Sequence, residues 1–409
     1  MKRLLLPFLA LLLFSCHHTA PNNSIEIGKI DSVYSKSLAE ERKIFVYLPA
    51  AAKDTSKRFP VLYLLDGDDH FASVSGIVKY FAERSVCPDM IIIGIPNTDR
   101  TRDLTPTRSL LYPDGSKSDD LKSSGGGEKF VSFIKNELMP HVDSLYPVAP
   151  YKLLIGHSFG GLTVMNILIN HPNLFNAYIA VDPSMWWDKQ KLLNQARQVF
   201  TQQKFAGKSF YMGIANTMPS GMDTLQVRID TTGTTFHIRS ILQLKDILLH
   251  NKSNGLNFNY AYYKNDDHGS SPLITEYDGL RFIFSYYKTP QLVFDQLLDK
   301  NNHTDAAKGF TEHYLEVSKN LGYTVLPPED QINGYVGFLA GSGQPQKALQ
   351  LLNLNIKNYP KSADVFDSLG DFYKAQKDKT KAVAAYEKAL LLKETAETRK
   401  KLNELQGKK

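Results

Sequence analysis

Residues 156–160 read Gly-His-Ser-Phe-Gly, a G-x-S-x-G pattern at the point where the chain changes from strand-like to helix-like periodicity. The run at 151–155 is short and apolar, as in a buried strand, and 161–170 is apolar over a length that suits a buried helix. A sharp strand-to-helix turn strains the backbone of Ser158 and exposes its hydroxyl at the carboxyl edge of a sheet. The pattern therefore predicts a nucleophilic serine, and the alternative is a structural Gly-rich turn.

The chain around this motif alternates between strand and helix patterns. Strand-like runs lie at 44–49, 61–65, 90–95, 151–155, 177–181, 209–214 and 256–263. Helical patterns lie at 128–146, 161–170, 189–200 and 238–251. Such alternation predicts an α/β protein with a mostly parallel sheet between helices, and its active site lies in loops at the carboxyl ends of the strands.

After Tyr287 the pattern becomes entirely helical. Residues 301–321 read as one amphipathic helix or a pair, and two later segments align at a period of 34, with Ala348 matching Ala382 and Leu352 matching Tyr386. This pattern is similar to the tetratricopeptide repeat. Because two repeats are fewer than the three or so of a free-standing array, they are expected to dock on 301–321 and on the α/β part. A plain bundle of helical hairpins is the alternative.

The N-terminus has the pattern of a targeting segment. Lys2 and Arg3 precede an apolar run at 4–14 that is too short to span a bilayer, and the run ends at Ser15-Cys16. This resembles a bacterial lipobox, so we expect a signal peptide at 1–16, lipidation of Cys16 and a tether at 17–24. The protein would then be anchored by lipid to a bacterial membrane in the cell envelope. Ordinary secretion, with Cys16 discarded, is the alternative.

Length and composition limit the remaining classes. A chain of 409 residues exceeds one comfortable core, which favours an α/β domain at 25–290 and a helical domain at 291–409. The net charge of +6 is mild and its basic residues alternate with acidic ones, which argues against nucleic-acid binding. Cys87 is the only cysteine besides Cys16, so no intramolecular disulfide is expected once Cys16 is lipidated or removed.

A serine hydroxyl needs a base, a group that orients the base, and donors for the oxyanion. In hydrolases with this elbow, the order along the chain is serine, acid, histidine. His268 is the first histidine after the last strand and precedes a glycine that allows the loop to turn back. His157, inside the elbow, is expected to point away, and His237 lies in or beside a helix. His268 is therefore the predicted base.

The acid is harder to assign. Its usual place is the loop after the strand at 209–214, which holds no glutamate and two aspartates, Asp223 and Asp230. Asp223 is the predicted acid and Asp230 the alternative. Asp182, after the preceding strand, could also act, and a dyad without an acid is a further option.

The amides of Phe159 and Asp68 are the predicted oxyanion donors, because Phe159 follows the nucleophile and Asp68 lies in the loop after the strand at 61–65. The carboxylates in that loop lack the spacing of a calcium loop, so no metal is expected. Arg102 could grip a substrate carboxylate or pair with Asp103 or Asp68. Trp187 could form an aromatic wall for an acyl group or pack in the core.

Six motifs occur in an order that resembles one known family. They are Val46-Tyr47-Leu48-Pro49, Pro60-Val61-Leu62-Tyr63-Leu64-Leu65-Asp66-Gly67, Arg102-Asp103-Leu104-Thr105-Pro106, Gly156-His157-Ser158-Phe159-Gly160-Gly161, Pro183-Ser184-Met185-Trp186-Trp187 and Asp267-His268-Gly269. Together, over about residues 25–290, they look like the esterase family that includes esterase D, enterochelin esterase and feruloyl esterases. The resemblance implies an α/β-hydrolase fold without a large lid and carboxylic-ester cleavage, with Ser158 as nucleophile and His268 as base. Asn216 stands where the family usually has an acidic residue, which leaves a dyad open.

The sequence therefore predicts a serine carboxylic-ester hydrolase that works through an acyl-enzyme without a cofactor. A trilactone siderophore, a feruloyl or acetyl ester on a glycan, and a lipid ester are all open as substrates. Acyl transfer by the same fold is one alternative. The other is an interaction protein, with a protein partner on the helical repeats and an inactive hydrolase domain.

Overall fold

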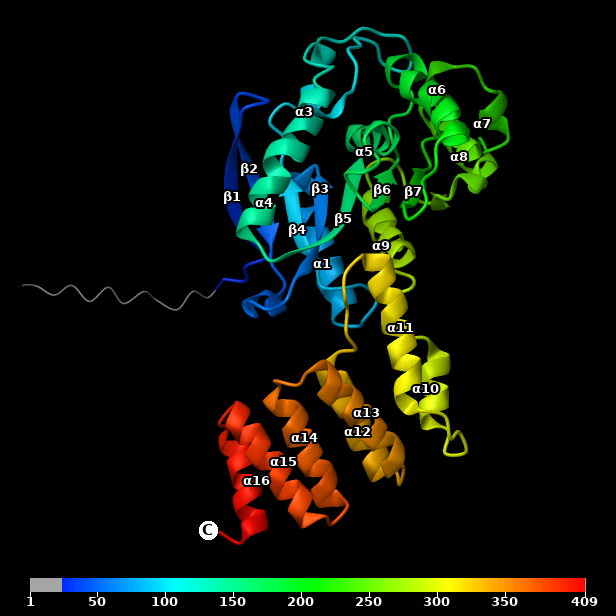
Figure 1. The fold of residues 1–409 in the computed structure, drawn as a ribbon. Coiled ribbons are helices and arrows are strands. Elements are labelled where there is room, and N and C mark those ends of the chain that lie inside the picture. The colour runs from blue at the N-terminus through cyan, green and yellow to red at the C-terminus, as the bar shows by residue number, and fades with distance from the viewer. Residues whose placement is uncertain (1–23, 409) are drawn as a thin grey trace, which may run out of the picture.

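The structure, a computed structural model, describes residues 24–408 (Figure 1). The predicted signal peptide, Cys16 and nearly all of the predicted tether lie outside this range. No helix within the described range is both long and apolar enough to cross a membrane.

One eight-stranded sheet organises the first part of the described chain, in the order β1-β2-β4-β3-β5-β6-β7-β8. The strands are β1 (Lys29–Ser35), β2 (Glu40–Tyr47), β3 (Phe59–Leu65), β4 (Ile91–Ile95), β5 (Val148–His157), β6 (Ala177–Val181), β7 (Ser209–Ala215) and β8 (Asn257–Tyr263). β1, β2 and β4 pair antiparallel, and all pairs from β4 to β8 are parallel. This is an α/β-hydrolase-like sheet, and it confirms the predicted mostly parallel α/β class.

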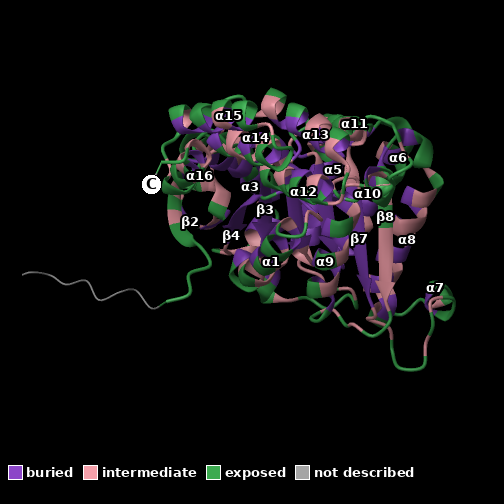
Figure 2. Ribbon diagram, turned by 90° about the horizontal axis from the view of Figure 1, so that it is seen from below, coloured by how far each residue is buried: buried purple, intermediate pink, exposed green. Residues whose placement is uncertain are grey.

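Helices cover both faces of the sheet. One face packs against α3 (Gly127–Phe133), the π-helical turn at Ile134–Leu138, α4 (Met139–Leu145), α5 (Phe159–Asn170), α6 (Trp187–Gln202) and α8 (Phe236–His250). The other face packs against α1 (Gly67–Ala82), α9 (Ser271–Ile283) and α11 (Ala306–Leu321). In β3 all seven residues are buried because alternate side chains enter the two cores. Figure 2 shows the resulting contrast between buried central strands and the more exposed β8.

The sequence patterns did not reveal every element. β1 was not predicted because it is an edge strand with mostly exposed side chains. α1 was treated as a loop because its first turn, Gly67 to His70, is polar. Two shorter helices, α2 (Arg100–Leu104) and α7 (Gln226–Ile229), follow β4 and β7 along the chain.

The described chain ends in a helical region that lies to one side of the sheet (Figure 1). Its helices are α10 (Gln291–Leu298), α11, α12 (Glu329–Gly341), α13 (Pro345–Asn358), α14 (Ala363–Ala375), α15 (Lys379–Leu392) and α16 (Ala396–Gln406). The pair α14 and α15 begins 34 residues after the pair α12 and α13. A Cβ on Gly370 would lie 2.3 Å from the Tyr386 ring, so the glycine allows α14 and α15 to pack closely.

Helix α11 belongs to both parts of the molecule. Phe310, near its start, packs with α12 and α13 residues such as Leu339 and Leu351. Val317 and Leu321, near its end, pack in the core on the α9 side of the sheet. The helical region therefore docks on 306–321, and the same helix is part of the sheet's own core.

Candidate functional site

The G-x-S-x-G segment forms the turn between β5 and α5. Ser158 has φ 59° and ψ −112°, a strained backbone for a residue with a side chain. A Cβ on Gly156 would lie 2.5 Å from the Gly160 carbonyl carbon, and one on Gly161 would lie 2.9 Å from Pro183 Cα. The glycines are therefore required by close backbone approach, and the turn presents Ser158 at the carboxyl edge of the sheet, as the motif predicts.

Two neighbouring strand ends carry the same kind of strain. Asp66 follows β3 with φ 52°, and Asp182 follows β6 with φ 42°. β3, β5 and β6 are adjacent in the sheet, so these two residues and Ser158 lie along one edge. Positive φ values at residues other than glycine cost energy and concentrate at functional sites.

His268 lies against an acid at this edge. Its Nδ1 is 2.6 Å from Oδ2 of Asp182, which is fully buried, while the His268 side chain is 41% exposed. In this arrangement Nδ1–H donates to the carboxylate and Nε2 is left free to accept a proton. Burial would raise the pKa of the Asp182 carboxyl, but His237 and His268 outweigh it and hold the pKa below its ordinary value.

The structure does not place Asp223 at the site. Its Oδ1 accepts hydrogen bonds from the amides of Leu225 and Gln226, so it caps the turn that leads into α7. Asp230 accepts hydrogen bonds from the hydroxyls of Thr232 and Thr235. Neither carboxylate bonds to His268 among the described residues. The prediction of Asp223 as the partner of His268 therefore differs from the geometry, which gives that contact to Asp182.

The Ser158 hydroxyl lies in the same group of residues. Its Oγ is 3.3 Å from Oγ of Ser184, and its amide donates to the carbonyl of Val181, directly before Asp182. Within the described residues no hydrogen bond joins Ser158 to His268. Catalytic hydrogen bonds are often long in the absence of substrate and tighten in the complex.

Further histidines surround His268. The His157 ring centroid is 4.5 Å from that of His268, so His157 packs against the predicted base. Burial, with His268 and His70 nearby, lowers the pKa of His157 to about 4. The His157 ring is therefore neutral at physiological pH. His70 lies 5.8 Å beyond His157 and pairs with buried Glu276.

Two helix N-termini meet near the serine. Phe159 is the first residue of α5 and Asp68 the second of α1, so their amides are among those that lack an intrahelical partner. A Cβ on Gly160 would lie 2.9 Å from Oδ2 of Asp66, which shows how closely the two turns approach. Amides at helix N-termini suit a developing negative charge.

Arg100, which the motif analysis did not single out, joins these turns. Its Nε and Nη2 donate to the two carboxylate oxygens of Asp66 at 2.7 and 3.0 Å. Its Nη2 also donates to the carbonyl of His157 at 3.1 Å, and Asn97 donates to Asp66 at 2.8 Å. The loop after β4 therefore ties the β3 turn to the serine elbow. Nothing in the sequence alone distinguishes Arg100 from Arg102 in this role.

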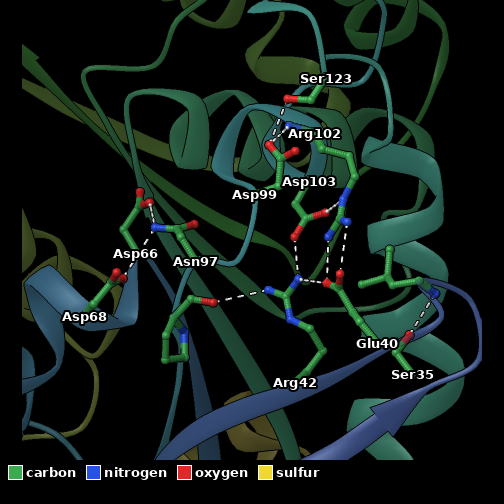
Figure 3. A network of polar contacts seen from close by, with 12 residues as sticks. Ser35, Glu40, Arg42, Asp66, Asp68, Asn97, Asp99, Arg102, Asp103 and Ser123 are labelled. Carbon is green, nitrogen blue, oxygen red and sulfur yellow. Dashed lines mark hydrogen bonds and ion pairs between the residues drawn. The ribbon is translucent and has the colours of Figure 1, made fainter. Parts of the chain in front are cut away.

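Arg102 is committed to a structural network (Figure 3). Its guanidinium donates to both oxygens of Glu40 and to Oδ1 of Asp103, while buried Arg42 bonds to the same two acids. All its charge-assisted contacts hold the loop after β4 against β2. The geometry thus follows the predicted pairing with Asp103, and each of the three guanidinium nitrogens donates to a carboxylate of the protein.

Trp187 packs in the core. It is 1% exposed, and its indole N–H donates to the carbonyl of Thr107 at 2.9 Å. Its ring meets Phe159 edge-on at 5.1 Å. Tyr112, which is 36% exposed, lies 6.4 Å from the Trp186 ring. Next to the serine, Phe159 is therefore part of an aromatic cluster with buried Trp186 and Trp187, and Tyr112 is its exposed member.

Asp182, His237 and His268 also form a group of side chains that could bind a metal ion, since their ligand atoms all lie within 4.8 Å of one another. The carboxylate oxygen lies 2.8 Å from His237 Nε2 and 2.6 Å from His268 Nδ1. These are hydrogen-bond lengths, whereas two ligands on a tetrahedral zinc ion stand roughly 3.3 Å apart. The observed spacing therefore fits hydrogen bonds from the N–H groups of His237 and His268 to the carboxylate.

Comparisons with known proteins match part of this chain to esterases. A family described as "Putative esterase" matches residues 35–219. The ferri-bacillibactin esterase BesA of Bacillus subtilis is 33% identical over 149 residues, which are 34% of this chain and 52% of that protein. The siderophore enterobactin esterase of Emericella nidulans is 31% identical over 162 residues, or 35% of this chain and 52% of that protein. The chain thus spans about half the length of the curated relatives that it matches.

Among solved structures, an IroE-like serine hydrolase from Shewanella oneidensis has a similar fold. It superposes with a TM-score of 0.68 at 28% identity, and the match covers 80% of this chain and 98% of that one. The sheet order, the serine elbow and this similarity together define an α/β-hydrolase-like protein with an additional helical region. The segment at 35–219 is similar to esterases.

Proposed function

We propose that the protein is a serine carboxylic-ester hydrolase. Ser158 Oγ attacks the ester carbonyl carbon while its proton passes to Nε2 of His268. The amides of Phe159 and Asp68 receive the oxyanion, and the alcohol leaves with the proton from His268. Water then cleaves the acyl-enzyme by the same route. Asp182 orients His268 through Nδ1 and stabilises the imidazolium as it forms.

The observation that carries this proposal is the 2.6 Å contact between His268 and Asp182 at the edge of the sheet that exposes Ser158. A structural histidine needs no buried carboxylate on Nδ1, and a structural turn needs no serine with a strained backbone. The matched region 35–219, which is similar to esterases, supports the same reaction class.

We propose siderophore esters as the substrate class. Two relatives that match this chain are named as esterases of siderophores. The aromatic cluster of Phe159, buried Trp186 and exposed Tyr112 suits an acyl group that carries a ring, which would contact Phe159 and Tyr112. The helix pairs α12–α13 and α14–α15 are proposed to be tetratricopeptide-like repeats that bind a protein partner. Cys16 is proposed to be lipidated, which would place the enzyme in the cell envelope.

The reaction class can be tested with a fluorophosphonate probe and a panel of esters on residues 24–409. We expect the wild type to be labelled and to hydrolyse at least one ester. Ser158→Ala should lose both properties, whereas Ser184→Ala should still be labelled because the nucleophile remains. Failure of the wild type to react with the probe and with every ester would reject the proposal.

A further inference from the structure

A second histidine bonds to the acid of the proposed site. Oδ2 of Asp182 lies 2.8 Å from Nε2 of His237 as well as 2.6 Å from Nδ1 of His268. Oδ1 accepts a hydrogen bond from the amide of Ala215 at 3.0 Å. The fully buried carboxylate is therefore held by three donors from three elements: the end of β7, the start of α8 and the loop after β8.

The protonation states follow from this arrangement. An ionised carboxylate only accepts hydrogen bonds, so each histidine must carry a proton on the nitrogen that faces it. A neutral His237 with its proton on Nε2 and a neutral His268 with its proton on Nδ1 satisfy both contacts. His237 can therefore hold the carboxylate without removing the proton acceptor at Nε2 of His268.

The two histidines differ in how firmly the fold holds them. His237 is the second residue of α8, a helix fixed in the core by residues that include Ile238 and Ile241. His268 lies on a loop, and its side chain is 41% exposed. The His237 ring stands edge-on to His268 at 5.3 Å, and the His157 ring lies on His268 at 4.5 Å. The better-anchored histidine thus fixes the carboxylate that orients the histidine on the loop.

We infer that His237 is a positioning residue for the proposed hydrolysis, acting through Asp182. This inference rests on the proposed function for its effect on catalysis. Without the His237 donor, one lone pair of Oδ2 is left open, and the carboxylate can turn away from His268. A hydrogen bond to a charged group is typically worth about tenfold to hundredfold in an equilibrium or rate. The loss is expected in kcat, because His237 acts on the base and not on the substrate.

Asp182, His157 and His237 all face His268, and His70 lies beyond His157. Arg239, on the same helix as His237, is bonded to the carbonyls of Asp230 and Thr232.

The test compares His237→Leu, which removes the donor, with His237→Gln, whose amide can place a donor close to the position of Nε2 and does not titrate. With p-nitrophenyl acetate or another accepted ester, the leucine variant should lose about tenfold to hundredfold in kcat, with KM within about twofold. The glutamine variant should regain most of the rate. The inference fails if the leucine variant matches wild type in kcat. It also fails if glutamine is as damaging as leucine in a protein that still melts like wild type.

A readout that does not depend on turnover separates this inference from the proposed function. In the low-field proton NMR spectrum, wild type should show two imidazole N–H signals from the bonds to Asp182. His237→Leu should remove one signal and shift the other. If wild type shows both signals but does not react with fluorophosphonate, the proposed hydrolase function is rejected and the inferred hydrogen bonds to Asp182 are retained. If His237→Leu neither removes a signal nor shifts one, the inferred role of His237 is rejected.

Discussion

Nδ1 of His268 lies 2.6 Å from Oδ2 of Asp182, although β7 separates the strands that precede the two residues. The loop after β8 reaches over the end of β7 and meets the residue that follows β6. Asn216, at the end of β7, donates to the carbonyl of Lys264 and so supports the returning loop. The partner of the histidine thus comes from one strand earlier than the place expected from sequence.

This relationship predicts different outcomes for two conservative substitutions. Asp182→Asn should lower kcat about 10⁴-fold, because an amide can stabilise the wrong tautomer of His268 and cannot stabilise its imidazolium. Asp223→Asn should stay within about tenfold of wild type, since Asp223 only caps a turn. Steady-state ester hydrolysis measures both. A large loss for Asp223→Asn with little loss for Asp182→Asn would reverse the assignment.

Partly buried His157 predicts a pH-dependent stability. Its pKa falls from an ordinary 6.5 to about 4 in the folded protein. Between these values the unfolded chain binds a proton that the folded protein does not, so stability decreases as the pH falls. The His157→Gln substitution should remove this pH-dependent contribution to stability, because glutamine does not titrate. The difference in unfolding free energy between wild type and variant should fall by about 2 kcal/mol from pH 7 to pH 5. Urea unfolding at both pH values measures it, and an unchanged difference would contradict the buried neutral state.

The network around Arg42 predicts a stability effect. Arg42 is 1% exposed and pairs with Glu40 and with buried Asp103. Arg42→Met should lower the free energy of unfolding by about 3 kcal/mol, because it leaves a buried carboxylate with one partner fewer. Lys43→Met, at the exposed neighbouring position of β2, is the matched control and should change stability little. Denaturant unfolding distinguishes them, and equal effects would show that the network adds no stability.

The packing of helix α11 predicts different stability losses for alanine substitutions at two of its leucines. Leu321 is 1% exposed in the core of the sheet, and Leu315 is 65% exposed on the same helix. Leu321→Ala should cost about 2–4 kcal/mol of stability, and Leu315→Ala should cost less than about 0.5 kcal/mol.

Truncation after residue 290, which removes α11, should destabilise the sheet more than truncation after residue 326, which keeps it. A fragment ending at 290 that unfolds at the same denaturant concentration as the longer one would show that α11 is dispensable.

The elements that sequence reasoning found are those with strong local signals. The run at 61–65 is apolar throughout because both faces of β3 are covered, and the glycines of the elbow mark a turn that only small residues fit. β1 and the polar first turn of α1 lack such signals, since an exposed edge strand and a polar helix start resemble loops. Local periodicity therefore recovered the strands from β2 to β8 but not the edge strand β1.

The site shows where local patterns stop being informative. Ser158 and His268 each have a local signature, in the elbow and in the loop after the last strand. Asp182 and Asp223 both satisfy the order serine, acid, histidine, and only the path of the loop after β8 selects Asp182. His237 lacked a local signature altogether, because its role depends on where the start of α8 lies in space.

The bonds from Arg100 to Asp66 and to the carbonyl of His157 have a consequence for how selectivity can arise. They cross-link the turn that carries Asp68 to the turn that carries Ser158, so the two proposed oxyanion donors are held relative to each other before any ester arrives. Little reordering of these two turns then has to accompany binding. Which ester is admitted would depend on other loops, while the donors at the sheet edge stay in place.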